Sequence, residues 1–242
     1  FNRVDPAITI ATLPDHATVT AGDMVATIKI IPLAVAGTLA RSAAATLAAG
    51  RALEVKAFAA HRVGLVATEL PSLKISVMDK TRRLLEQRLH LSGSRLTSEV
   101  RVPHQPTVLA EAIRRAAGEN ELVVVFGASA VTDANDVIPA AIRAAGGVVE
   151  HVGMPVDPGN LLVLGRVGTV PVLGAPGCAR SPKENGFDWI LARIFAGENP
   201  GAKEITGMGV GGLLTEIPTR PQPRDLRMPE RPLSVAALVL DR

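Results

Sequence analysis

The order of apolar and polar positions predicts that strands and helices alternate through the middle of the chain. Short apolar runs typical of buried strands begin at Arg62 (RVGLVAT) and Leu122 (LVVVF). Between such runs, apolar residues recur every three or four positions, which predicts amphipathic helices at 77–91, 136–145 and 184–196. We therefore expect an α/β fold, a three-layer α/β/α domain with a mostly parallel sheet.

Further elements follow from local signals. Thr107 is a fair N-cap for a helix with apolar residues at 108, 109, 112, 113 and 116. The runs LLVLG (161–165) and TVPVLG (169–174) predict a hairpin.

The two ends of the chain have a different pattern. Residues 1–60 predict a small N-terminal β element, a hairpin around Pro14 and Asp23, followed by an Ala-rich helix at 38–49. Residues 199–242 are rich in Gly and Pro and predict an irregular tail and linker. The expected organisation is therefore 1–60, an α/β domain at 61–198, and the tail.

Composition narrows the function classes. The chain is 47% hydrophobic but only 2% aromatic, so the core must be built mainly from Val, Leu, Ile and Ala, and platforms for stacking bases are scarce. The net charge of +3 comes from scattered basic residues. We expect no nucleic-acid partner. No apolar run reaches the ~20 residues that span a bilayer, so no membrane partner is expected either.

The loops that follow the strands carry the candidate chemistry. Open α/β sheets bind ligands at the carboxyl ends of their strands, where the expected loops are 68–76, 127–136 and 174–185, with 153–160 nearby. Small residues after a strand and the N-terminus of the next helix suit an anion. Asp133 and Asp136 precede a helix, where an acid is either a cap or a ligand of Mg²⁺.

Two Pro-Gly turns, Pro158-Gly159 and Pro176-Gly177, add further candidates. Each turn either presents backbone N–H groups to a ligand or serves loop geometry alone. Arg180 and Lys183 either meet oxyanions or are solvated. Cys178 is the single cysteine, which excludes an internal disulfide and fits a cytoplasmic protein; without an adjacent His it reads as a structural residue. The residues expected to bind the ligand are Thr68, Glu69, Gly127, Ala128, Ser129, Ala130, Pro155, Val156, Asp157, Pro158, Gly159, Pro176, Gly177, Cys178, Arg180, Ser181 and Lys183.

Residues 63–197 resemble the molybdopterin-binding domain shared by molybdopterin adenylyltransferases and molybdopterin molybdotransferases. The motifs VGLVATELPSLK, VVVFGASAVTDANDVIPAAI, GMPVDPGN and PVLGAPGCARSP occur in the family's order. The resemblance implies a role in molybdenum cofactor biosynthesis with molybdopterin as ligand or substrate, together with Mg²⁺ and ATP. Asp136 matches the position that works with magnesium, and Asp133 and Asp136 are the implied catalytic acids.

Two departures from the family pattern favour binding over adenylyl transfer. The glycine-rich loop keeps Gly127 but continues with Ala128, Ser129 and Ala130. His104 follows Val102-Pro103 where the family usually has a second acid, and imidazole is a poorer ligand than carboxylate for a hard cation.

The flanks extend the resemblance. SVAALVL at 234–240 resembles the opening strand of molybdenum-cofactor nucleotidyltransferases, so we expect the chain to be part of a longer bacterial fusion protein that forms a homo-oligomer.

Three functions remain open at this stage. The first is a protein that holds the pterin phosphate for nucleotidyl or molybdate transfer. The second is a non-catalytic carrier or scaffold module that serves a fused nucleotidyltransferase. The third is a phosphohydrolase that acts on free nucleotides.

Overall fold

A six-stranded sheet forms the centre of the computed structural model, which describes residues 1–50 and 53–214. Its strand order is β4-β3-β5-β8-β7-β6. β7 runs antiparallel to both of its neighbours, and the other strands share one direction. The mostly parallel sheet and the β7–β8 hairpin are as predicted. The strands are β3 (Arg62–Glu69), β4 (Arg95–Pro103), β5 (Leu122–Phe126), β6 (Val148–Val152), β7 (Val163–Val167) and β8 (Val170–Ala175).

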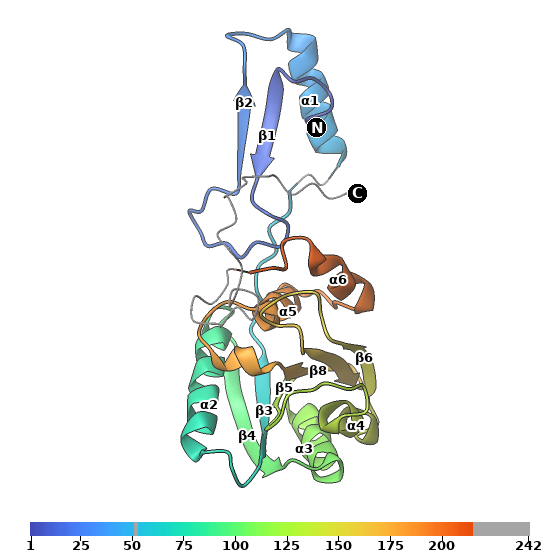
Figure 1. The fold of residues 1–242 in the computed structure, drawn as a ribbon. Coiled ribbons are helices and arrows are strands. Elements are labelled where there is room, and N and C mark those ends of the chain that lie inside the picture. Colours follow the sequence, from blue (N-terminus) through green and yellow to red (C-terminus); the bar gives the residue numbers. More distant parts are fainter. Residues whose placement is uncertain (51–52, 215–242) are drawn as a thin grey trace, which may run out of the picture.

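Helices cover both faces of this sheet (Figure 1). Alternate residues of β5 belong to two different cores: Val124 packs in the cluster that includes Leu85 and Ile190, whereas Val125 packs in the one that includes Ile138. Each face of the sheet therefore has its own apolar core, and the three-layer prediction is confirmed. The helices are α2 (Ile75–His90), α3 (Pro106–Glu119), α4 (Val137–Ala144) and α5 (Gly186–Phe195).

The start of α3 differs from the prediction. Gln105 is the N-cap and Pro106 occupies the first turn, so Thr107 already lies inside the helix. Proline is pre-organised for this position because its φ angle is helical and its missing N–H would be unpaired there in any case.

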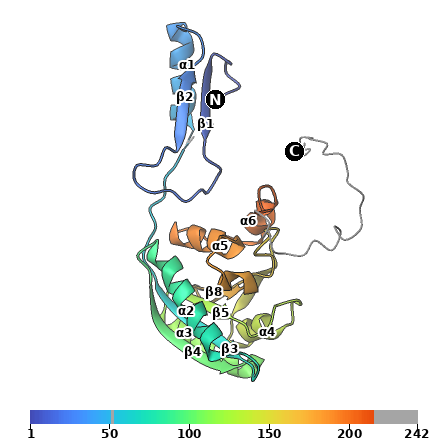
Figure 2. The same ribbon diagram turned by 60° about the vertical axis from the view of Figure 1, so that its left-hand side comes forward.

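The N-terminal residues form a separate small unit, which Figures 1 and 2 show beyond the end of the main sheet. β1 (Ile8–Thr12) and β2 (Ala26–Ile30) pair antiparallel, and α1 (Gly37–Ala49) lies beside them. The predicted hairpin and helix are confirmed. Phe58, in the connection to β3, packs edge-on against Phe195 of α5 with 6.0 Å between ring centres.

The segment after α5 is more ordered than expected. Where an irregular tail was predicted, α6 (Ala202–Thr206) and the 3₁₀ helix η2 (Gly207–Gly209) form, and Ile205 and Met208 join the core on the α2–α5 face. The pattern was misleading because five residues are too few to show helical periodicity. The Pro-rich stretch 218–232 and the run at 234–240 lie outside the described residues. In the part of the chain that is described, no helix has the length and apolar character to cross a membrane.

Candidate functional site

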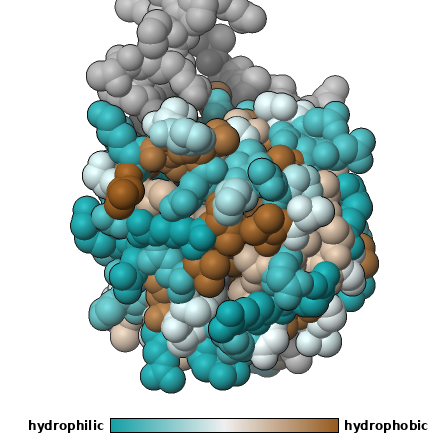
Figure 3. Space-filling view, turned by 90° about the horizontal axis from the view of Figure 1, so that it is seen from below, coloured by the Kyte–Doolittle hydropathy of each residue, from teal (hydrophilic) through white to brown (hydrophobic). Residues whose placement is uncertain are grey.

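The carboxyl ends of β3 and β5 form the switch point of the sheet, and we call the region between the loops that follow them, 68–76 and 127–136, the crevice. From β3 the chain passes to β4 on one side and then returns to β5 on the other side of β3. Ligands of open α/β sheets bind at such points, because the loops there diverge toward opposite faces. In Figure 1 the arrow of β4 points away from the N-terminal unit, and Figure 3 views that end of the molecule, where hydrophilic side chains surround smaller apolar patches.

Side chains from three successive strand ends meet in this crevice. Thr68, near the end of β3, accepts a hydrogen bond through Oγ1 from the backbone N–H of Ala128 (2.7 Å). The same oxygen lies 2.8 Å from Nδ1 of His104, and Nε2 of His104 lies 2.9 Å from Oγ of Ser129. The loops that follow β3 and β5 therefore meet at this end of the sheet.

His104 is part of the site although the sequence presented it as a departure from the family pattern. Its backbone N–H donates to the carbonyl of Glu69 (3.1 Å), which places it beside the end of β3. The feature of the sequence that could have identified His104 as a site residue was its position directly after β4, at the carboxyl end of a parallel strand. Glu69 itself is exposed.

The turn after β5 requires the glycine that the sequence retains. A Cβ at Gly127 would lie 2.9 Å from the carbonyl oxygen of Ser129 and 3.0 Å from Ile138, so the chain turns too tightly for a side chain. Gly127 is buried, whereas Ser129 and Ala130 are exposed. The loop therefore presents the Ser129 hydroxyl at its mouth.

Arg180 reaches the same loop from the 3₁₀ helix η1 (Gly177–Arg180), which follows β8. Its Nη2 donates to the carbonyl of Gly127 (2.8 Å), and its guanidinium carbon lies 5.1 Å from the centre of the Phe126 ring. Burial lowers the pKa of this guanidinium, and within residues 1–50 and 53–214 it forms no ion pair with a carboxylate. A half-buried cation without a counter-ion is costly, and an anionic ligand would compensate it.

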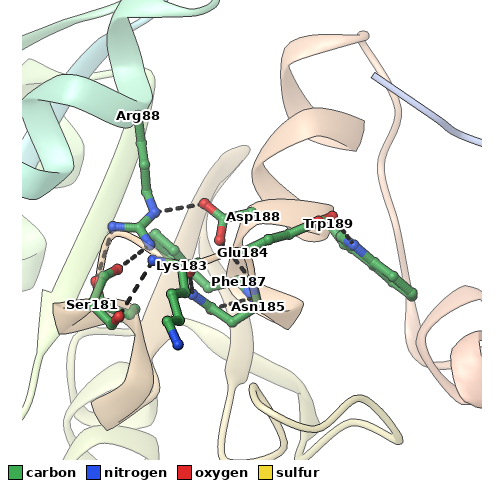
Figure 4. Close-up of polar contacts among 9 residues, drawn as sticks. Arg88, Ser181, Lys183, Glu184, Asn185, Phe187, Asp188 and Trp189 are labelled. Atoms are coloured by element: carbon green, nitrogen blue, oxygen red, sulfur yellow. Dashed lines mark hydrogen bonds and ion pairs between the residues drawn. The ribbon is translucent and has the colours of Figure 1, made fainter. Parts of the chain in front are cut away.

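Arg88 fixes the loop that carries Arg180 (Figure 4). From α2, it donates to Oδ1 of Asp188 (2.5 Å) and to the carbonyls of Ala179 (2.9 Å) and Ser181 (2.7 Å). Arg88 was not among the residues predicted for the site. Its signal in the sequence was an arginine on the mostly apolar buried stripe of α2, four residues after Leu84.

The start of α5 is fixed by a capping box, also drawn in Figure 4. Asn185 accepts from the N–H of Phe187 (3.1 Å), and Asp188 accepts from the N–H of Asn185 (3.0 Å). Lys183 is exposed, and its side chain extends away from this network in Figure 4. Of the two cations expected in this loop, Arg180 reaches the crevice and Lys183 does not contact it.

The two candidate acids are engaged in local structure. Asp136 caps α4, accepting from the N–H of Val137 (2.7 Å) through one oxygen and from that of Thr132 (3.2 Å) through the other. Asp133 accepts from the N–H of Asn135 (2.6 Å). The described residues contain no cluster of three or more His, Cys, Asp or Glu side chains placed to hold a metal ion. Asp136 therefore serves as a helix cap here, and the described residues gather no set of carboxylate, histidine or cysteine ligands around it for Mg²⁺.

The first Pro-Gly turn, 155–159, packs against other backbone segments. The N–H of Asp157 donates to the carbonyl of Gly212 (2.8 Å), and the carbonyl of Pro158 accepts from Gly186 (2.9 Å). A Cβ at Gly159 would lie 2.5 Å from the nitrogen of Gly186. Val156 is buried and Pro155 is exposed. The backbone donor of Asp157 is thus already used inside the protein.

The second Pro-Gly turn begins with buried Pro176 and exposed Gly177. Cys178 is half-buried, and burial raises the pKa of its thiol. That environment agrees with a structural residue.

A cavity of about 780 Å³ lies at the other end of the sheet, near the start of β3 and β4, between the N-terminal unit and the end of α5. Leu13, His16, Phe58 and Arg193 are among the residues that line it. It shares no residue with the crevice.

The fold is an α/β domain that places the half-buried guanidinium of Arg180 at the carboxyl ends of its strands. The comparisons with known proteins give its family. The model of the probable molybdopterin binding domain matches residues 65–195, more than half of the chain. The chain therefore belongs to the family of probable molybdopterin-binding domains, which supports a role in molybdenum cofactor biosynthesis.

Solved structures that match part of the chain include two described as molybdopterin biosynthesis proteins. The molybdopterin biosynthesis MoeA protein of Pyrococcus horikosii is 20% identical, with a TM-score of 0.41 over 57% of this chain and 35% of its own. The molybdopterin biosynthesis enzyme MoaB of Thermus thermophilus is 17% identical, with a TM-score of 0.36 over 55% of this chain and 89% of its own. This chain thus covers about a third of the Pyrococcus protein. No curated protein matches it.

Proposed function

We propose that this protein binds molybdopterin by holding its phosphate in the crevice between β3 and β5, in the service of molybdenum cofactor biosynthesis. The observation that carries the proposal is Arg180, a half-buried guanidinium at the Gly127 turn with no carboxylate partner among the described residues. Membership in the molybdopterin-binding family supports the identity of the ligand.

The chemistry of the crevice suits a phosphate monoester. Such a group carries about 1.5 to 2 negative charges at neutral pH and offers only acceptor oxygens. A guanidinium can donate two parallel hydrogen bonds to it, and the exposed Ser129 hydroxyl can donate a third. In this arrangement Arg88 contributes by fixing the backbone on either side of Arg180.

In this proposal the protein holds the pterin and does not itself transfer an adenylyl group with magnesium and ATP. Asp136 caps α4 and holds the preceding loop, and the described residues gather no set of metal ligands around it, so no step is assigned to a metal there. Presentation of the pterin to a fused nucleotidyltransferase, and self-association of the chain, are proposals that rest on the sequence resemblance alone.

Arg180 variants test the proposal directly. We expect Arg180→Ala to weaken binding of molybdopterin at least tenfold, since a hydrogen bond to a charged group contributes about 1.5–3 kcal/mol. Arg180→Lys should recover only part of the affinity, because an ammonium keeps the charge and loses the fork. Titration calorimetry gives the affinities, and Arg115→Ala, on the exposed face of α3, is the matched control.

Two results would contradict this function. One is a wild-type protein that does not bind molybdopterin. The other is an Arg180→Ala variant that binds as tightly as Arg115→Ala. Adding Mg²⁺ and ATP to the bound protein separates holding from transfer, because holding predicts no adenylylated product.

A further inference from the structure

A chain of hydrogen bonds leads from the buried end of β3 to the exposed loop after β5. It passes from the N–H of Ala128 to Thr68, from Thr68 to Nδ1 of His104, and from Nε2 of His104 to Ser129, with distances of 2.7, 2.8 and 2.9 Å. Thr68 is completely buried and Ser129 is exposed. His104 therefore connects an interior hydroxyl to one at the mouth of the crevice.

The burial of Thr68 determines which nitrogen of His104 carries the hydrogen. The hydroxyl of Thr68 already accepts from Ala128, and its own hydrogen needs an acceptor because a buried unpaired donor is unfavourable. Among the hydrogen bonds of the described residues, Nδ1 of His104 is the acceptor within reach. Thr68 thus donates to Nδ1, and a neutral imidazole then carries its hydrogen on Nε2.

We propose that His104 is a positioning residue that makes Ser129 a hydrogen-bond donor to the oxyanion of the ligand. With its hydrogen on Nε2, His104 donates to Oγ of Ser129. One lone pair of that oxygen then accepts from the protein side, and the hydroxyl hydrogen, which His104 cannot accept, is directed toward the crevice. This inference rests on the proposed function and adds the specificity: the mouth presents donors and so selects ligands whose oxygens only accept, such as a phosphate monoester.

The same geometry excludes His104 as a base for Ser129. A serine nucleophile needs an unprotonated Nε2 to receive its proton. Here that nitrogen carries the hydrogen, so the pair does not form a hydrolytic Ser-His arrangement. The direction of the chain therefore disfavours a serine nucleophile at this site.

Two conservative variants separate positioning from structural support. In His104→Asn the amide oxygen can replace Nδ1 as the acceptor for Thr68, but nothing reaches Ser129. In His104→Gln the longer amide can donate to Ser129, and Thr68 loses its acceptor. A positioning role predicts that Gln retains most of the affinity for molybdopterin and Asn does not. A merely structural role predicts the reverse.

A double-mutant cycle gives the second test. We expect Ser129→Ala to weaken binding about tenfold, as for loss of one hydrogen bond to a charged group. His104→Asn combined with Ser129→Ala should bind no more weakly than Ser129→Ala alone, because His104 acts through Ser129. Additive losses, or an Asn variant that binds like wild type, would overturn the inference.

A ligand-free measurement completes the experiment. Nitrogen-15 NMR of the imidazole is expected to show His104 with its hydrogen on Nε2, and a hydrogen on Nδ1 would refute the assignment. If wild type binds molybdopterin and Arg180→Ala weakens it while the His104 variants bind normally, the positioning role fails and the proposed function stands. If wild type binds no molybdopterin, both fail.

Discussion

Two arginines near the crevice differ in their hydrogen-bond partners, and these partners determine the role of each arginine. Arg88 is almost completely buried, yet Asp188 and two carbonyls satisfy its guanidinium. Arg180 is half-buried with one carbonyl and the face of an aromatic ring. Arg88 is therefore a structural clamp, whereas Arg180 has no carboxylate partner among the described residues. At the residue scale, it is the position of Arg180 beside the Gly127 turn, together with its unused donors, that makes it a candidate for ligand binding.

The thiol of Cys178 should be less reactive than that of a free cysteine. Burial disfavours the thiolate and so raises the pKa, which means that less thiolate is present at any given pH. We expect the midpoint of the alkylation rate against pH, measured with iodoacetamide, to lie above that of the same protein unfolded in urea. Equal midpoints would show that the thiol is not shielded.

At the scale of elements, contacts between segments distant in sequence shape the crevice. Arg88 on α2 bonds to residues of η1 and the following loop that lie 91 and 93 positions away. The capping box at Asn185 then sets where α5 begins. Together they fix both ends of the segment that carries Arg180.

Removal of the clamp should destabilise the whole domain. Arg88→Met leaves Asp188 and two carbonyls without their donor, and we expect a loss of about 3 kcal/mol in the free energy of unfolding, as for breaking a buried ion pair. Urea denaturation measures it. Arg82→Met, on the same helix, is the control, since the exposed guanidinium of Arg82, which pairs with Glu86 and Glu99, should contribute less than about 1 kcal/mol. Equal losses for the two variants would argue against the clamp.

Two glycines should respond to alanine with opposite signs. At Gly174 in β8 a Cβ would lie 2.8 Å from Cβ of Val163 and 3.1 Å from Ile138, so Gly174→Ala should cost about 1–3 kcal/mol of stability by overpacking. Gly118, near the end of α3, has open space around the same position, so Gly118→Ala should add about 0.5 kcal/mol through helix propensity. Thermal unfolding checks both signs, and a stabilised Gly174→Ala would refute the packing described.

At the scale of the whole molecule, two apolar cores on opposite faces of one sheet hold the layers together. The core on the α2–α5 face extends beyond α5 to Ile205 and Met208. The α/β unit thus includes residues that composition alone assigned to a linker.

Ile205 tests this extension of the core. Ile205 is fully buried, so Ile205→Ala should lower the free energy of unfolding by about 2–4 kcal/mol through lost burial and the cavity left behind. Lys203→Ala, on the exposed side of the same short helix, should change it by less than about 0.5 kcal/mol. Urea denaturation of both variants gives the comparison. If Ile205→Ala unfolds like the control, α6 is not part of the cooperative core.

The spacing of apolar residues was enough to predict the main strands, the long helices and the three layers. This is because the spacing that gives a strand or a helix an apolar face can be read from a few consecutive residues. It also identified Thr68, Gly127, Ser129 and Arg180 as candidates, since each follows or ends a predicted strand. The short helix α6 and the proline-led start of α3 were not resolved, because few residues carry each signal.

Tertiary structure alone decided how these candidates combine. Thr68 is separated from His104 and Ala128 by 36 and 60 positions along the chain, and only the pairing of β3 with both β4 and β5 brings them within hydrogen-bond distance. In the tertiary structure His104, which stands where the family usually has an acid, connects the buried hydroxyl of Thr68 to Ser129 in the loop after β5. Asp136 is the N-cap of α4. Local pattern indicates which face of a long helix or strand is apolar, whereas hydrogen bonds and charge pairing depend on neighbours that the order of the chain does not reveal.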